Sequence, residues 1–285
     1  MNFIRTGEYR PDALGRLVEI NSLEETQKRL KRMNYLLGFV KERNPEVFPE
    51  YVRNLLAKYQ EISRDNQTVS NPFDLEVLVS SNPNLREHFE LAKAVLNYYL
   101  RILQIPEDAT LEKSNVVNKN FLQSFLHPAY YNLLVLTETL GRENAIALYK
   151  KFVTHYIMDR RDPERSTYDN LETVFKEAIK TREEPSDWVL VRGMIGDGKY
   201  AYRNDNCLWV DAMEDFSDPE LKYYVCCYGD YESSKVYHDS IILTMEHTIA
   251  RGDPYCSRVL HDTRVDWDLK HPPKDFWDSM KPENE

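Results

Sequence analysis

Apolar residues recur at every third or fourth position along the first 180 residues of the chain, the spacing of one buried helical face. The segment 22–44 is the clearest case, because Ser22 precedes Glu25 by three positions, as in a capping box. The same periodicity predicts further helices in residues 45–63, 82–105, 127–140, 142–160 and 167–184. Pro106 and Gly141 supply two of the expected helix ends. The first part of the chain is therefore predicted to be helical.

After Pro185 the pattern changes to the alternation that is typical of strands. Residues 187–214 alternate around "GDGK" at 196–199, a hairpin signal, and a plain turn there is favoured over a phosphate loop. Residues 218–231 are expected to begin as a helical turn and to continue as an aromatic strand. Residues 237–267 predict two strands joined through "ARGDPY". Helices followed by an antiparallel sheet predict an α+β fold.

A polar stretch at 106–120 separates the two patterns and predicts a boundary. We therefore expect a helical N-terminal extension over residues 1–110 and an α+β domain over residues 111–268. Residues 269–285 are expected to form a C-terminal tail, in which Phe276 and Trp277 can dock.

Charge and hydropathy limit the kinds of partner. The 285 residues carry a net charge of −10, which argues against a broad nucleic-acid surface. No apolar run approaches the roughly 18–20 residues of a membrane span, and the N-terminus lacks the apolar core of a signal peptide. A cytoplasmic protein that binds a small-molecule substrate, without nucleic acid or membrane, is expected. The amphipathic N-terminal helices leave a homo-oligomer possible.

The four cysteines all lie in the last third of the chain, and three of them were candidates for chemistry. Cys207, Cys227 and Cys256 are each expected on a strand of one small sheet. Together with His247 they could form a tetrahedral zinc site, but no CxxC pair supports it, and no metal or cofactor is predicted. A disulfide is disfavoured in a cytosolic protein. Taken singly, each cysteine is at least as readily a small buried apolar side chain.

A nucleophilic site is the second interpretation of these residues. A thiolate at Cys227 would need a nearby base, which His247 could provide, with Asp230 or Asp253 orienting the imidazole. His155 shares an apolar helical stripe, where a core histidine is commoner than a ligand, and it is kept as a candidate for substrate binding. His238 and His261 are secondary candidates.

Read in order, several segments of the last 170 residues resemble the L-2-amino-thiazoline-4-carboxylic acid hydrolase family. "LLVLTETLGRENAIALYKKFV" is similar to a helix pair of that family with a central LGxExA. "DPELKYYVCCYGDY" resembles its "pel…C..D" segment, and Cys207 in "NCLW" stands where the family tends to have a preceding cysteine. "HTIARGDPYCSRV" resembles the most specific segment, "RTxTlaxGdxxCdF". The resemblance places these residues on family positions: Cys207, Cys227, Asp230, Thr248, Gly252, Asp253 and Cys256.

The resemblance implies an α+β fold related to 4-vinyl-reductase-type small-molecule-binding domains. It also implies hydrolytic opening of a cyclic amidine, the aminothiazoline carboxylate, to a carbamoyl-cysteine. Three features depart from the family pattern: His247 replaces an arginine, "CSRVLHD" replaces "CDFxF", and about 110 N-terminal residues have no counterpart.

The resulting hypothesis is a hydrolase that opens a C–N bond of a small cyclic amidine-like substrate. Cys227 would be the nucleophile or a polarising thiol, His247 the acid/base, and Asp230 or Asp253 the orienting carboxylate. The residues expected to contact the substrate are Cys207, Thr248, Cys256 and His155. Two alternatives stay open: a biosynthetic enzyme of the same fold that forms or rearranges a ring, and a non-catalytic ligand sensor.

Overall fold

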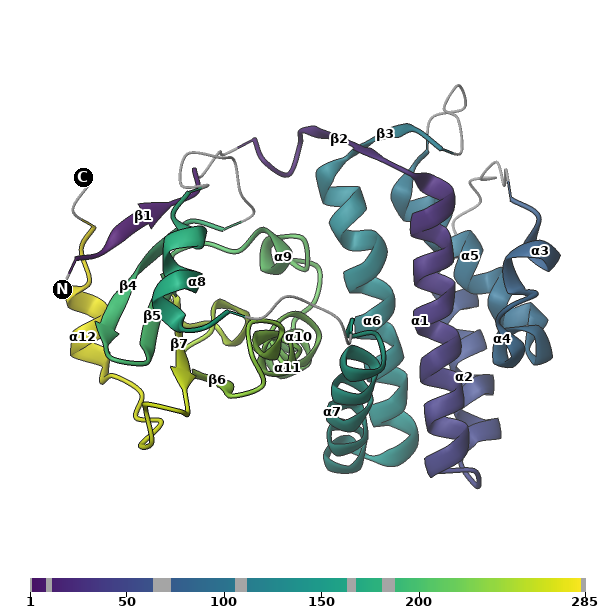
Figure 1. The fold of residues 1–285 in the computed structure, drawn as a ribbon. Helices are drawn as coiled ribbons and strands as arrows, with labels where there is room; N and C mark the ends of the chain where they lie inside the picture. The colour runs from purple at the N-terminus through teal and green to yellow at the C-terminus, as the bar shows by residue number, and fades with distance from the viewer. Residues whose placement is uncertain are drawn as a thin grey trace. The chain divides into compact units, whose positions relative to one another are not determined.

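The computed structural model describes residues 2–8, 12–63, 73–105, 112–162, 168–180 and 188–282 (Figure 1). The chain forms two compact units, one of residues 14–152 and one of residues 1–13 together with 153–285. A division into compact units does not test the predicted domain boundaries at residues 110 and 268, which remain a prediction. Of the helices in the described ranges, none combines the length and apolarity that a bilayer crossing requires.

Helices dominate the unit of residues 14–152, as their periodicity predicts. Its elements are β2 (Leu17–Ile20), α1 (Ser22–Arg43), α2 (Phe48–Ile62), α3 (Leu75–Val79), α4 (Pro83–Glu87), α5 (Phe89–Leu103), β3 (Ser114–Val117), α6 (Asn118–Leu140) and the first part of α7 (Arg142–Asp159). The predicted helix over 82–105 is interrupted at His88, which separates α4 from α5. The N-cap of α1 is Asn21 rather than Ser22, because the Asn21 side chain accepts the Glu24 N–H at 3.0 Å.

The core of this helical unit is closed by the apolar faces of α1, α2, α5 and α6, and two tyrosines add polar contacts within it. Tyr59 is fully buried and donates a hydrogen bond to Oδ1 of Asn132 at 2.9 Å. Tyr51, also fully buried, donates to the main-chain oxygen of Asn132 at 3.3 Å. The predicted polar connector of residues 106–120 contains β3, which pairs antiparallel with β2, and its last three residues begin α6. Its residues 106–111 lie outside the described residues.

The second unit contains a five-stranded sheet and confirms the predicted α+β class. Its elements are β1 (Ile4–Thr6), α8 (Leu171–Ala178), β4 (Leu190–Gly196), β5 (Lys199–Asn204), α9 (Leu208–Asp211), α10 (Pro219–Cys226), α11 (Asp230–Ser233), the 3₁₀ turn η1 (Ser234–Val236), β6 (Ile241–Met245), the 3₁₀ turn η2 (Ile249–Arg251), β7 (Cys256–Asp262) and α12 (Lys274–Ser279). All pairings are antiparallel, in the order β1-β4-β5-β7-β6 (Figure 1). The "GDGK" hairpin and the two strands flanking "ARGDPY" are confirmed as β4–β5 and β6–β7.

Side chains of β5 and β7 alternate between the two faces of the sheet, as the strand period of two requires. One face packs against α8 through a core of Leu171, Val174, Tyr200, Ile241, Leu243 and Leu260. The other face packs against helix α12 and the residue after it. This core consists of Phe3, Val191, Ala201, Tyr255 and Val259 together with Trp277 and Met280. Within the predicted tail, Trp277 is thus docked in helix α12 with 0% of its surface exposed.

The aromatic strand predicted within residues 218–231 is wrong, because this segment forms α10 and α11. Asp218 is the N-cap of α10 and accepts the N–H groups of Glu220 and Leu221, both at 3.1 Å. Pro219 occupies the first helical position, where its fixed φ favours a helix. This strong helix start outweighs the strand propensity of the aromatic and cysteine residues that follow.

Candidate functional site

A cavity of about 240 Å³ lies in the sheet unit, on the face of the sheet that carries Tyr202, Asn204 and Arg258. This volume is below the roughly 300–1,000 Å³ of most drug-sized ligand pockets, so the cavity fits a small molecule. Its walls combine aromatic rings, thiols, one carboxylate and one guanidinium. The strands β5 and β7 form one wall, and the segment from α9 to η1 forms the other.

All four cysteines line this cavity, although the strands predicted for most of them are absent. Cys207 is the N-cap of α9, Cys226 is the last residue of α10, and Cys227 is its C-cap. Only Cys256 is on a strand, as the first residue of β7. The predicted convergence of Cys207, Cys227 and Cys256 therefore occurs through helix ends rather than through neighbouring strands.

Burial keeps these thiols in their neutral form. It raises the pKa of Cys207 to about 11 and raises the pKa of Cys256 as well. Burial raises the pKa values of Cys226 and Cys227 well above that of a free thiol. Each thiol is therefore protonated near neutral pH and can donate a weak hydrogen bond. Within the described ranges, no group of three or more His, Cys, Asp or Glu side chains is placed to hold a metal ion.

The charged part of the cavity wall is an ion pair between Arg258 and Asp230. Nη2 of Arg258 donates to Oδ2 of Asp230 at 2.7 Å, and 11% and 39% of the two side-chain surfaces are exposed. Burial raises the pKa of Asp230, while Arg258 acts in the opposite direction. Burial alone would lower the pKa of Arg258, but the charge of Asp230 outweighs it, so the guanidinium stays charged.

Asp230 was a predicted site residue, but Arg258 was not, although the sequence holds a signal for it. Arg258 follows Cys256 by two positions on β7, and residues two apart on a strand face the same side of the sheet. A predicted site at Cys256 could thus have included Arg258.

Aromatic rings and one amide complete the wall. The rings of Trp188 and Trp209 lie 5.6 Å apart between centroids, and both line the cavity together with Tyr202. Asn204, the last residue of β5, also lines it. Only 2% of the Asn204 surface is exposed, and its Oδ1 has no hydrogen-bond partner. The walls thus favour a flat ligand with hydrogen-bond donors.

The family-like segment around "ARGDPY" forms a closed loop that leads into β7. Oδ2 of Asp253 accepts the N–H of Thr248 at 2.7 Å, and Gly252 has the left-handed φ of 96° that favours glycine. The loop ends with the N–H of Ile249 donating to Sγ of Cys256 at 3.3 Å. Asp253 and Thr248 do not line the cavity. Their hydrogen bond instead holds the loop that positions Cys256.

His247 and His155, two further predicted site residues, also lie outside the residues that line the cavity. The main-chain N–H of His247 donates to Oγ of Ser257 at 3.0 Å, and its Nδ1 lies 3.1 Å from the same oxygen. Ser257 lies between Cys256 and Arg258 on β7, so its side chain faces the opposite side of the sheet. His155 is exposed on α7. The structure therefore brings Cys207, Cys227, Cys256 and Asp230 together, but not His247, Thr248, Asp253 or His155.

On that opposite face, His247 is the end of a chain of hydrogen bonds. Nε2 of His271 lies 3.0 Å from Oγ of Ser257, and its Nδ1 lies 2.9 Å from Oγ1 of Thr244. The same Thr244 oxygen lies 2.8 Å from Nε2 of His261. The chain links β6 and β7 to the C-terminal segment through two hydroxyls and three imidazoles.

The hydrogen bonds of this chain can all be oriented in one direction, starting from its buried end at Asp266. Nδ1 of His261 lies 2.5 Å from Oδ2 of Asp266, which accepts its proton when ionised. Nε2 of His261 then accepts the hydroxyl proton of Thr244. Because that hydroxyl has only one proton, the Thr244 oxygen must accept from Nδ1 of His271. By the same reasoning, Ser257 donates to Nε2 of His271 and accepts from Nδ1 of His247. In this arrangement His261 and His271 each accept a proton at Nε2 and are therefore neutral. His261, a secondary candidate, is fully buried in this role.

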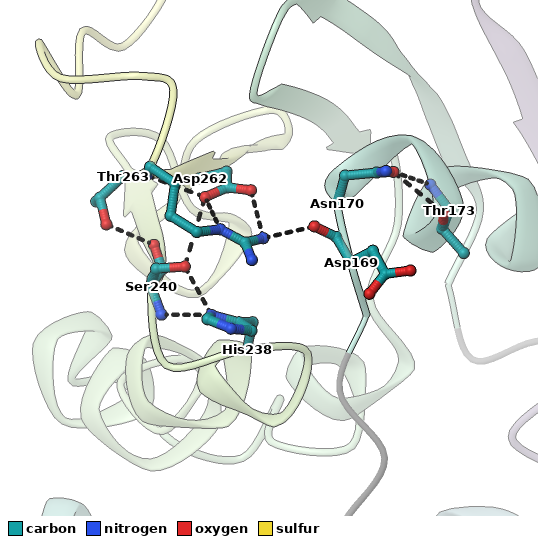
Figure 2. A network of polar contacts seen from close by, with 8 residues as sticks. Asp169, Asn170, Thr173, His238, Ser240, Asp262 and Thr263 are labelled. Atoms are coloured by element: carbon teal, nitrogen blue, oxygen red, sulfur yellow. Dashed lines mark hydrogen bonds and ion pairs between the residues drawn. The ribbon is translucent and has the colours of Figure 1, made fainter.

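His238, the other secondary candidate, belongs to a polar network around the start of β6 (Figure 2). Ser240 donates to Nδ1 of His238 from its main-chain N–H at 3.0 Å, and its Oγ lies 2.7 Å from the same nitrogen. Nη2 of Arg264 donates to Oδ2 of Asp262 at 2.7 Å and to the main-chain oxygen of Asp169 at 2.9 Å. These residues do not line the cavity, and the network ties β6, β7 and the segment before α8 together.

A second cavity of about 420 Å³ adjoins the first, since Cys207 lines both. Its other wall residues include Arg5, Asp205 and Asp211. Burial raises the pKa of Asp211. Cys207 is thus shared by a small cavity with aromatic walls and a larger one that is richer in charged groups.

The family model described as L-2-amino-thiazoline-4-carboxylic acid hydrolase matches residues 121–259, from α6 to β7. The matched segment contains all four cysteines, Asp230, Asn204 and Arg258. No curated protein and no solved structure gives a significant match to the chain. The family is named for a hydrolase, and the chain is similar to it over residues 121–259, a little under half of its length.

Proposed function

We propose that the smaller cavity is the active site of a hydrolase that opens a C–N bond of a small cyclic amidine carrying a carboxylate. The observation that supports it is the Asp230–Arg258 ion pair, which lines a small cavity with aromatic and thiol walls inside the family-matched segment. A cyclic amidine is flat and basic, and both properties suit these walls.

On binding, each partner of the ion pair would interact with the oppositely charged end of the substrate. The guanidinium of Arg258 offers parallel N–H donors that match a carboxylate. The Asp230 carboxylate, 2.7 Å from Arg258 in the free protein, would accept hydrogen bonds from the amidinium. Because Asp230 and Arg258 already neutralise each other, a zwitterion fits better than a ligand with one charge.

The reaction would then use Asp230 as the acid/base. As the oxygen of a water molecule bonds to the amidine carbon, one of its protons passes to Asp230. The C–N bond of the ring breaks as Asp230 returns that proton to the leaving nitrogen. The added hydroxyl then gives its remaining proton to the Asp230 carboxylate, so that the carbon becomes a carbonyl, and Asp230 passes this proton to the released amine. Burial raises the pKa of Asp230 above that of an exposed aspartate, which favours its return of the proton to the leaving nitrogen.

Cys227 would act as a polarising thiol in this mechanism. Its raised pKa keeps the S–H proton in place, and a neutral thiol donates a hydrogen bond better than it attacks carbon. Covalent attack would need a base beside Cys227, and His247 contacts Ser257 on the other face of the sheet. The acid/base role predicted for His247 remains a prediction that this mechanism does not use.

The test is turnover of 2-amino-2-thiazoline-4-carboxylate by purified protein and its variants. Asp230→Asn and Arg258→Gln should each lower kcat/KM by about 100-fold or more, and Cys227→Ala by less. Arg264→Gln is the matched control, because it removes a 2.7 Å ion pair with Asp262 outside the cavity. Wild-type turnover rules out a purely non-catalytic sensor. Full activity of Asp230→Asn would contradict the mechanism.

A further inference from the structure

The Asn204 side chain is the one polar group on the cavity wall, among the described residues, that combines near-complete burial with an unused acceptor. Its Oδ1 is buried and has no hydrogen-bond partner, and 2% of the residue is exposed. A buried acceptor without a donor costs folding free energy, so such a group usually has a purpose in a native protein. The cavity that Asn204 lines is the place from which a donor can reach it.

The register of the sheet fixes where Asn204 stands relative to Arg258. Asn204 on β5 is directly opposite Cys256 on β7, and Arg258 follows Cys256 by two positions. Asn204 and Arg258 are therefore diagonal neighbours on one face, a relation that separates residues by roughly 7–8 Å. A small ring can span that distance, with a carboxylate at Arg258 and an N–H at Asn204.

We propose that Asn204 accepts a hydrogen bond from an exocyclic N–H of the substrate and thereby selects amino-substituted rings over rings that lack this hydrogen. This inference rests on the proposed function, since it takes the cavity to be the substrate site. A site with an unpaired acceptor discriminates strongly, because a ligand without the donor leaves the acceptor buried and unsatisfied. Asn204 would thus be a specificity-determining residue, while Asp230 and Arg258 serve charge and catalysis.

The experiment compares the binding of two zwitterionic amidines, 2-amino-2-thiazoline-4-carboxylate and 2-dimethylamino-2-thiazoline-4-carboxylate. Binding is measured from the change in tryptophan fluorescence within milliseconds of mixing, before turnover, because Trp188 and Trp209 line the cavity. Both rings are cationic when protonated, but only the first has an exocyclic N–H. Wild-type protein should bind the amino ring about tenfold more tightly. Asn204→Leu keeps the side-chain volume and removes the acceptor. It should weaken binding of the amino ring about tenfold and change binding of the dimethylamino ring by less than about twofold.

Two further variants make the result specific. Asn204→Asp retains acceptor oxygens and should retain a preference for the amino ring. Asn144→Leu makes the same substitution at an exposed position of α7 and should leave both affinities unchanged. If Asn204→Leu does not fold, the wild-type comparison and Asn204→Asp still decide the question.

The possible failures are distinguishable. Equal wild-type affinity for the two rings overturns the role of Asn204 and leaves the proposed function standing. A preference that persists in folded Asn204→Leu, or that disappears in Asn204→Asp, overturns it as well. Binding of neither ring by the wild type contradicts the proposed ligand class itself, and the inference fails with it.

Discussion

Arg258 on β7 and Asp230 at the start of α11 are 28 positions apart in the chain and meet across 2.7 Å on the wall of one cavity. The pair is surrounded by thiols and aromatic rings, which screen charge poorly. Arg258, with 11% of its side-chain surface exposed, therefore depends on Asp230 to compensate its desolvation. This dependence makes the pair a structural element of the cavity as well as its chemical centre.

The first prediction concerns the energetic coupling within this pair. Arg258→Gln should lower the free energy of unfolding by about 1–3 kcal/mol, because it leaves the Asp230 carboxylate without its partner. In the double variant with Asp230→Asn, part of this loss should be recovered. Urea denaturation of the wild type, both single variants and the double variant measures the coupling. Strict additivity of the two single losses would contradict the pairing.

The second prediction concerns the reactivity of the cavity thiols. Because burial raises the pKa values of all four cysteines, their alkylation by iodoacetamide at pH 7.5 should be at least about tenfold slower than that of glutathione. In urea all four should react at the rate of free thiols. Mass spectrometry of tryptic peptides assigns the rate to each cysteine. Rapid labelling of Cys227 in the folded protein would instead favour a covalent role for it.

The parts of the fold that the sequence predicts well are those with local signals. The hairpin between β4 and β5 follows from "GDGK", where Gly198 has a φ of 71°. The end of α6 follows from Gly141, with a φ of 77°. In both places one residue fixes the backbone, and no distant contact is needed to interpret it.

The cavity depends on contacts between distant segments, and there the sequence was a weaker guide. "YYVCCY" has strand propensity, but the Asp218–Pro219 helix start decides its structure. His247 is close in sequence to Cys256, yet alternation along β7 places its partner Ser257 on the opposite face. Of the residues that the family resemblance singled out, Cys207, Cys227, Asp230 and Cys256 line one cavity, whereas Thr248 and Asp253 do not. No local pattern records which of them meet, because that depends on tertiary contacts.

The third prediction concerns the histidine chain and pH. Burial, together with the neighbouring His261 and His247, lowers the pKa of His271 to about 4. Because the unfolded histidine titrates near 6.5, the folded state favours the neutral form. Its contribution to stability should therefore be complete above about pH 6.5 and decline as the pH falls toward 4, by about 1–3 kcal/mol.

Urea denaturation at several pH values between 4 and 8 checks this dependence. His271→Gln should reduce the loss of stability on acidification, while lowering stability at pH 7.5 because the bonds to Thr244 and Ser257 weaken. His155→Gln, at an exposed position of α7, serves as the control and should leave the pH dependence as in the wild type. An unchanged pH dependence in His271→Gln would show that other groups cause it.

The fourth prediction compares two tryptophans that follow β7, Trp267 and Trp277. Trp277 is fully buried against the sheet, stacks on His271 with 5.2 Å between ring centroids, and donates from Nε1 to the main-chain oxygen of Pro272 at 3.0 Å. Trp267 has 84% of its surface exposed. Trp277→Ala should therefore lower the free energy of unfolding by about 3–5 kcal/mol, the range for a large buried aromatic side chain. Trp267→Ala should change it by less than about 0.5 kcal/mol. Chemical denaturation followed by circular dichroism compares the two variants directly, and equal losses would mean that α12 is not part of the folded core.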